Sequence, residues 1–359
     1  MGRIKTSSTT SGSRAGTRSD PEAALEEAKG LIMKAEWVKA STLIGKHVQK
    51  PPPDARSKSV LIKLLLARAF ALAEMSDLNG AEKDSLMALS QSRELKDAKL
   101  EGEALRQLAN VTWKKGDIKK AEGYLDEVQA IASKFDDERL RGLVHLERGT
   151  IFCQTTRLDL AEREYREAVL SLVKAGDLQE QARAFNNLGC TVYFTKDYER
   201  GVEVFSKARK LAQRAGNSSL ISWGAINLAV CLYELGRFRE ALDELNIALP
   251  VLERSKDIVG ILSVHETKGL IYSRMGEWEK AEKHLFKGLA LAQRSGMPLN
   301  EGRAFADIAK MYKWRGNKEM AARNFKKALD ILDKLGAKTE AEKVREDMND
   351  PSCSGPMRA

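Results

Sequence analysis

Six polar side chains recur at one constant spacing, forty positions apart, and we call this set the polar column: Gln107, Glu147, Asn187, Asn227, Thr267 and Asp307. Carboxamides such as Asn187 and Asn227 can both donate to and accept from a peptide main chain, which makes recognition tolerant of side-chain identity. Tyr193 and Tyr233 lie nearby and could anchor a ligand. Such a column suits an extended peptide or a bound helix, although any solvated helix face is also polar.

Residue types that carry catalysis or bind metal ions are few and scattered. The sequence has four histidines, namely His47, His145, His265 and His284. Its four cysteines lack the short spacing of a metal or redox site and are expected to be free thiols: Cys153, Cys190, Cys231 and Cys353. No HExxH sequence, phosphate-binding loop, nucleophile elbow or paired-carboxylate site stands out. We therefore expect a non-enzymatic chain with no metal and no cofactor.

Small residues repeat with the same period and indicate the elements that must position the polar column. Successive members stand forty or forty-one positions apart: Ala40, Ala81, Ala121, Ala161, Gly201, Ala241, Ala281 and Ala321. A second small residue precedes each by twelve positions, and larger apolar residues mostly lie three before and four after it. Offsets of three, four and seven share one helical face. Eight units in phase predict an all-α solenoid of about eight stacked helix-turn-helix repeats.

The composition changes at both ends of the array. Residues 1–20 are mostly Ser, Thr, Gly and Arg and predict a disordered basic tail. Residues 21–336 hold the repeats, and residues 337–349 predict a capping helix that covers the last apolar face. Residues 350–359 are expected to form a flexible tail. No apolar run approaches the ~20 residues of a membrane span, and we expect a soluble cytoplasmic protein.

The repeat resembles the tetratricopeptide repeat. The resemblance rests on the stretch NLGCTVY at 187–193 followed by Asp197-Tyr198, on 227–229 with Gly236-Arg237-Phe238, and on 269–272 with Gly276-Glu277-Trp278. It covers roughly residues 21–348. The period of about 40 is longer than the family's usual 34 and is similar to the long-repeat subset found in kinesin light chains.

The resemblance implies a right-handed superhelix whose first helices line a concave groove, and it implies protein or peptide binding far more often than catalysis. On that geometry, ten residues are expected on the groove side: Arg106, Asn110, Trp113, Arg183, Asn186, Asn187, Tyr193, Trp223, Asn227 and Tyr233. Glu147 lies between Arg106 and Arg183 and opposes an anionic ligand there. We thus predict a scaffold or adaptor that binds a peptide or helix of a partner protein.

Two alternatives remain open. The net charge is +9, of which the segment 1–19 carries +4, and basic residues also recur on the second helices, so an RNA-binding helical repeat is possible. These basic residues are interleaved with acids such as Glu279 and Asp330, which is typical of a solvated face. The other alternative is a regulatory sensor subunit of a larger complex, which would use the same groove.

Overall fold

The computed structural model describes residues 21–33, 36–48 and 54–350, and these residues form seventeen α-helices and no strand. The predicted tails at 1–20 and 350–359 lie outside the described residues, except for Asp350. The helices are α1 (Pro21–Met33), α2 (Trp37–Gly45), α3 (Ala55–Glu74), α4 (Leu78–Leu95), α5 (Ala98–Lys114), α6 (Ile118–Lys134), α7 (Glu138–Gln154), α8 (Leu158–Ala175), α9 (Leu178–Phe194), α10 (Tyr198–Ala215), α11 (Ser218–Glu234), α12 (Phe238–Ser255), α13 (Ile258–Arg274), α14 (Trp278–Arg294), α15 (Pro298–Trp314), α16 (Lys318–Lys334) and α17 (Lys338–Asn349). The predicted all-α class is confirmed.

Most connections between helices are built from one short device. A residue with positive φ, such as Gly116 or Gly176, is followed by an Asp or Asn whose side chain accepts a hydrogen bond from the first turn of the next helix. A side-chain oxygen at this position satisfies an otherwise unpaired backbone N–H. The caps of this kind are Asp77, Asp97, Asp117, Asp137, Asp177, Asp197, Asn217, Asp257 and Asn317. These compact turns, placed between long helices of nearly constant length, account for the regular period of the sequence.

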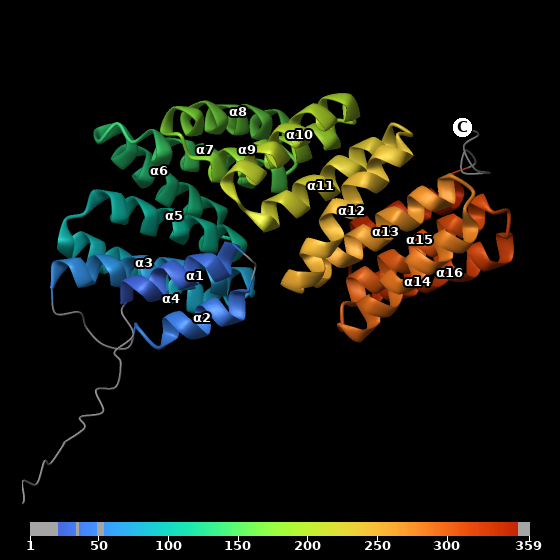
Figure 1. Ribbon diagram of the computed structural model, residues 1–359, viewed down its shortest axis with the longest axis horizontal. Helices are drawn as coiled ribbons and strands as arrows, with labels where there is room; N and C mark the ends of the chain where they lie inside the picture. Colours follow the sequence, from blue (N-terminus) through green and yellow to red (C-terminus); the bar gives the residue numbers. More distant parts are fainter. Residues whose placement is uncertain (1–20, 34–35, 49–53, 351–359) are drawn as a thin grey trace, which may run out of the picture.

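Successive helices pack against one another in chain order and follow a curved path from α1–α4 to α13–α16 (Figure 1). Each odd-numbered helix also contacts the next odd-numbered helix, from α1 through to α17. No two even-numbered helices of the described chain share a comparable set of contacts. The odd-numbered helices therefore form a continuous inner layer and the even-numbered helices an outer one. The right-handed sense of the superhelix and the number of family-type repeats stay predictions.

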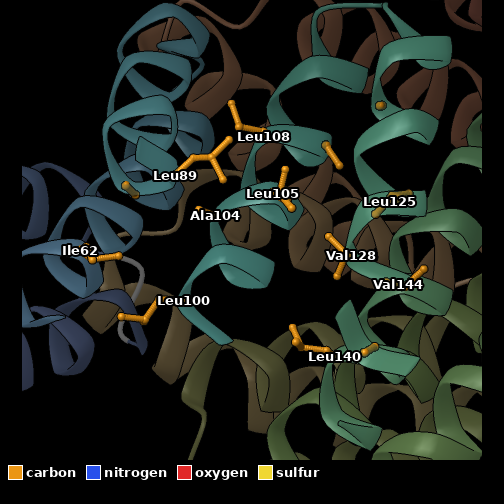
Figure 2. Packing of buried hydrophobic residues seen from close by; sticks show 14 of the residues in the cluster. Ile62, Leu89, Leu100, Ala104, Leu105, Leu108, Leu125, Val128, Leu140 and Val144 are labelled. Atoms are coloured by element: carbon orange, nitrogen blue, oxygen red, sulfur yellow. The ribbon is translucent and has the colours of Figure 1, made fainter. Parts of the chain in front are cut away.

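The core of each repeat interface is formed by apolar side chains from three successive helices. Figure 2 shows Leu105 and Leu108 of α5 between Leu89 of α4 and the pair Leu125 and Val128 of α6. Leu108, Leu125 and Val128 are fully buried. No helix pair could bury this surface alone, so each repeat depends on its neighbours for stability.

Small residues let an aromatic ring enter two of these interfaces. A Cβ atom added to Gly149 would lie 2.7 Å from the ring of Tyr165, and one added to Gly189 would lie 2.6 Å from that of Phe205. Tyr165 and Phe205 are consequently almost completely buried in the core. The sequence periodicity predicted this close approach of paired helices, and the structure confirms it.

Within the described ranges, no helix combines the length and apolar character that crossing a membrane requires.

Candidate functional site

The inner layer lines an open cavity of about 840 Å³, which we call the inner cavity. Its lining comes from α1, the first residue of α2, α3, α5, α7, α9, α11 and the start of α13. Residues from α1 and from α13 line the same space although they are more than 200 positions apart in the chain. The odd-numbered helices thus follow an arc around the cavity, and the first repeat faces the α12–α13 region across it, where the two ends of the arc come closest.

The two ends of this arc carry the large apolar side chains of the lining, beside polar and charged residues such as Lys29 and Asp257. The end formed by α1 to α3 contributes Ile32, Met33, Trp37, Leu66 and Phe70. There, the rings of Trp37 and Phe70 pack edge to face with centroids 5.7 Å apart. The end formed by α11 to α13 contributes Leu220, Trp223, Ile258 and Val259. Trp223 is held in place because its Nε1 donates to Asp257 Oδ2 over 3.2 Å.

The middle of the arc, on α5, α7 and α9, is charged. Its centre is the buried carboxylate of Glu147, which accepts hydrogen bonds from Arg183 Nη2 at 2.7 Å, Arg106 Nη1 at 3.1 Å and Asn110 Nδ2 at 3.4 Å. Glu147 is only 1% exposed. Burial alone would raise the pKa of Glu147, but the charges of Arg183 and Arg106 outweigh burial and hold that pKa below its ordinary value. Glu147 therefore stays ionised and fixes three side chains from the helices on either side.

A second acid continues this network toward the start of the helices. Glu103 on α5 pairs with Arg106 and with Arg139 of α7, and Arg139 Nε donates to Asp177 Oδ2 at 2.8 Å. Burial lowers the pKa of Arg139, yet Glu103 and Asp177 outweigh it and the pKa lies above its ordinary value. Each guanidinium group is thus neutralised within the protein. Among the described residues, this network offers no unpaired positive charge to an anionic ligand.

The structure brings three of the ten predicted groove residues to the inner cavity, namely Arg106, Arg183 and Trp223. Asn110 supports Arg106 and Arg183 through the carboxylate that all three share. The other six lie on inner helices but do not line this cavity: Trp113, Asn186, Asn187, Tyr193, Asn227 and Tyr233.

The polar column has a structural role that the sequence did not reveal. Asn227 of α11 donates its Nδ2 to Asn186 Oδ1 of α9 at 3.0 Å and contacts Cys190 Sγ at 3.8 Å. Glu147 reaches back from α7 to α5 in the same way. Asp347 of α17 lies at the next position of this register and is 3.6 Å from Lys310 of α15. Two of the six column residues, Glu147 and Asn227, therefore connect consecutive inner helices.

A further polar cluster lies on the inner helices near the C-terminal end. Lys310 pairs with Asp307 at 2.6 Å. Burial and the nearby charge of Asp307 raise the pKa of Glu266 on α13 to about 7. Glu266 Oε1 is buried and accepts no hydrogen bond within the described part of the chain. None of these residues lines the inner cavity.

Sequence reasoning missed the residues of the first repeat and two charged residues of the network. Trp37 fits a helix-packing position of the sequence pattern, and that pattern predicts neither Phe70 nor Arg139 for the groove. Glu103 occupies the same register as Arg183 and Trp223, two and three periods before them, so the spacing could have identified it. The closure of the arc by α1 and α2 has no comparable signal in the sequence.

The residues described here offer no metal centre, since they contain no group of three or more His, Cys, Asp or Glu side chains placed to hold an ion. Cys153, Cys190 and Cys231 are free thiols, and Cys353 lies outside the described residues. Burial raises the pKa of Cys190 and of Cys231 to about 12, which disfavours the reactive thiolate form.

The sequence matches the family model described as "Tetratricopeptide repeat" over residues 180–254 and 260–334. The first matched stretch begins at position 180 and the second at position 260, so their starts are separated by two periods of the sequence pattern. No curated protein sequence matches the chain.

Solved structures with similar folds include three that share few identical residues with this chain. One is a signal-transduction ATPase with numerous domains, with a tetratricopeptide repeat sensor, from Pyrococcus horikoshii. Its TM-score is 0.63 at 17% identity, and the similarity covers 91% of this chain and 52% of that chain. The second is the apo form of RapI, with TM-score 0.59, 11% identity and coverage of 77% and 99%. The third is a Rap protein complexed with Competence and Sporulation Factor, with TM-score 0.54, 12% identity and coverage of 91% and 96%.

The present chain spans about half the length of the Pyrococcus protein. At these identities the likeness concerns the fold alone. The sequence match identifies residues 180–254 and 260–334 as tetratricopeptide repeats, and the regular register and the two layers of helices continue the same fold through the rest of the described chain.

Proposed function

We propose that the chain is a non-enzymatic adaptor that binds a segment of a partner protein in the inner cavity. The observation that carries this proposal is a single cavity that combines apolar side chains at both ends with a charge-balanced middle. A volume of about 840 Å³ lies in the range of pockets that bury most of a small ligand's surface. Apolar surface provides affinity, and a few fixed polar groups orient the ligand.

The charge of the inner cavity favours a protein segment over nucleic acid. Among the described residues, the lining has five cationic side chains, which are Lys29, Arg106, Arg139, Arg183 and Lys256. Four lining acids and the adjacent Glu147 oppose them, the four being Glu74, Glu103, Glu180 and Asp257. Nucleic-acid binding depends on an excess of positive charge that displaces counterions. RNA binding on the outer helices stays a separate prediction. It requires that RNA affinity falls as salt is added, so RNA binding that is insensitive to salt would contradict it.

A sensor role is the second candidate, and the descriptions of similar structures favour it. One neighbour is described as complexed with Competence and Sporulation Factor, another as a quorum sensor from B. thuringiensis with TM-score 0.52 and 13% identity. A sensor and an adaptor would use the same cavity. They differ in whether binding of the ligand changes the chain's association with a further protein.

Selection from a random linear peptide library on the immobilised protein tests cavity binding. Ala67 lines the inner cavity, so Ala67→Trp should fill it and lower the affinity for selected peptides at least tenfold. Leu86→Trp is a matched control because Leu86 is 48% exposed on the outer helix α4. Circular dichroism would verify that both variants keep their helices. Equal binding by Ala67→Trp and the wild type would exclude the inner cavity as the site.

A further inference from the structure

We propose that a cluster of basic side chains on α12, α13 and α14 binds a phosphate group, at a site separate from the inner cavity. Six residues form this set, which we call the basic cluster: Asn246 of α12, His265 and Lys268 of α13, and Lys283, His284 and Lys287 of α14. None of the six lines the inner cavity. The inference therefore does not depend on what binds there.

The first observation is a buried lysine that lacks an acidic partner. Lys268 is only 5% exposed, and its amine donates a hydrogen bond to Asn246 Oδ1 at 2.7 Å. Among the described residues, no carboxylate lies within ion-pair distance of this amine, and the charge of Glu253 acts on it only from farther away. Buried charges are normally paired because an isolated one is unfavourable. Lys268 thus lacks the anion that its burial calls for.

The second observation is a pair of histidines in the same cluster. His265 Nδ1 and His284 Nδ1 are 2.9 Å apart, so one ring donates and the other accepts. Burial lowers the pKa of both to about 4, and the charges of Lys268 and Lys287 act on each in the same direction. The pair is consequently neutral at pH 7 and provides no counter-charge for the lysines.

The cluster is open to solvent on its outer side. Asn246, Lys283 and Lys287 are exposed, and neither of these two lysines forms an ion pair with a described residue. The Lys268 amine reaches the exposed side chain of Asn246, so the amine lies toward the surface although the rest of Lys268 is buried. An ion from solvent can therefore approach the amines without entering the core.

The chain contains the same arrangement three periods earlier, with acids in place. The six equivalent positions, in the same order, are Asp126, His145, Arg148, Arg163, Glu164 and Glu167. Arg148 Nη2 donates to Asp126 Oδ1 at 2.7 Å, and His145 Nδ1 lies 2.7 Å from Glu164 Oε2. Both basic side chains of α7 thus have a carboxylate partner from a neighbouring outer helix.

The basic cluster has lost both of those carboxylates. The amide of Asn246 takes the position of Asp126, and the imidazole of His284 takes that of Glu164. A third acid, Glu167, is replaced by Lys287. The same backbone framework therefore presents three cations and no acid in one case, and two cations with three acids in the other. This difference points to an external anion at the basic cluster.

The number and kind of donors favour a phosphate group over a carboxylate. Three amines and two imidazoles can donate to one anion, and a phosphate group has three acceptor oxygens and nearly two negative charges near pH 7. A single carboxylate has two oxygens and one charge. Charge-assisted hydrogen bonds of this kind are the stronger class.

Imidazole NMR signals provide a direct test, because the chain has only four histidines. Inorganic phosphate, compared with sodium chloride of equal ionic strength, should move the signals of His265 and His284 saturably and raise the pH at which both rings take up a proton. His145 is an internal control because its partner is the carboxylate of Glu164. Signals that stay in place, or that move equally for His145, would overturn the proposal.

Asn246→Asp is the decisive variant, since it gives Lys268 the partner that Arg148 has in Asp126. It should weaken phosphate binding at least tenfold, with the midpoint of thermal unfolding in chloride unchanged or higher. Ser206→Asp is the matched control, because it adds the same charge at the same register of α10. Undiminished binding by Asn246→Asp would show that the Lys268–Asn246 contact only joins two helices.

Lys268→Met and a choice of ligands complete the test. Lys268→Met removes the unpaired cation and should bind phosphate at least tenfold more weakly while keeping its fold in chloride; undiminished binding would exclude Lys268 from the site. A phosphoserine peptide that binds tighter than inorganic phosphate would assign the site to a phosphorylated partner, and equal or weaker binding to a free phosphate ester. Equal affinity for the same peptide with Asp in place of phosphoserine would contradict the assignment to phosphate.

Discussion

Arg183 of α9 donates a hydrogen bond of 2.7 Å to the Glu147 carboxylate of α7, a residue of the preceding repeat. The same carboxylate accepts from Arg106 of α5, so one buried acid joins three successive inner helices. The charged middle of the inner cavity is therefore also an inter-repeat connection. Stability and the shape of the cavity depend on the same side chain.

Removal of this acid should destabilise the protein strongly. Glu147→Ala leaves Arg106 and Arg183 without their shared buried partner, a type of change that costs about 3–5 kcal/mol. Urea unfolding followed by circular dichroism measures the loss. Glu127→Ala is the control, since Glu127 pairs with Arg93 at the surface and such pairs contribute about 0–1 kcal/mol. Similar effects for the two variants would contradict the buried network.

Two glycines should respond in opposite directions to the same substitution. Gly189→Ala places a Cβ 2.6 Å from Phe205 and should destabilise by about 1–3 kcal/mol through overpacking. Gly123 lies inside α6, and a Cβ added there would meet no described neighbour within 4 Å. Gly123→Ala should therefore stabilise by about 0.5–1 kcal/mol through helix propensity. Thermal unfolding of the two variants tests both signs, and a stable Gly189→Ala would mean that the Phe205 ring can move aside.

A pair of histidines between α13 and α14 should lower the stability of the protein at acidic pH. His265 and His284 face each other with Nδ1 atoms 2.9 Å apart, and burial, with nearby Lys287 and Lys268 contributing, lowers the pKa of each to about 4. The unfolded chain binds more protons between pH 4 and 6.5, so stability should fall as the pH falls through that window.

The expected size between pH 7 and pH 5 is about 2 kcal/mol for each histidine, and so about 3–4 kcal/mol for the pair. The double substitution His265→Asn with His284→Gln should flatten this part of the profile relative to the wild type in urea unfolding. Parallel profiles for the two proteins would show that the pair does not titrate as its burial requires.

Glu266 should give the opposite pH dependence, because it lowers the stability of the protein as the pH rises. Burial, assisted by Asp307, raises its pKa to about 7, so the folded state binds more protons than the unfolded state between pH 4.5 and 7. Stability from the protonated form is then lost as the pH rises through 7. Glu266→Gln should stabilise the protein by about 1–3 kcal/mol at pH 8 and much less at pH 4.5. Equal effects at the two pH values would show that Glu266 is ionised throughout.

The fold could be predicted from the sequence because each repeat carries the same local information. Small residues such as Gly189, large apolar residues such as Phe205 and caps such as Asp197 recur at one period, and each acts within a few residues or on an adjacent helix. Packing rules that operate over such short separations can be read directly from spacing.

The site could be predicted only in part because its two ends lie far apart in the sequence. Arg106, Arg183 and Trp223 are predicted on the inner side and do line the cavity. The contribution of Trp37 depends on the rotation that the superhelix accumulates over several repeats. No local sequence pattern encodes this accumulated rotation. Asn227 is predicted to face a ligand, but part of its hydrogen-bonding capacity is used by Asn186, a pairing that requires the register between α9 and α11.

The closure of the arc has a consequence for how many repeats the chain can hold. A solenoid of this kind gains stability from each neighbouring pair, so its fold tolerates the loss or gain of a unit. The inner cavity does not, because Ile32 and Val259 line the same space only when all the intervening units are present. Deletion of a single internal repeat would leave a folded protein in which the first unit faces a different later unit across the cavity. The number of units between α1 and α13 is thus constrained by the shape of the inner cavity, to which the units after α13 contribute no lining residue.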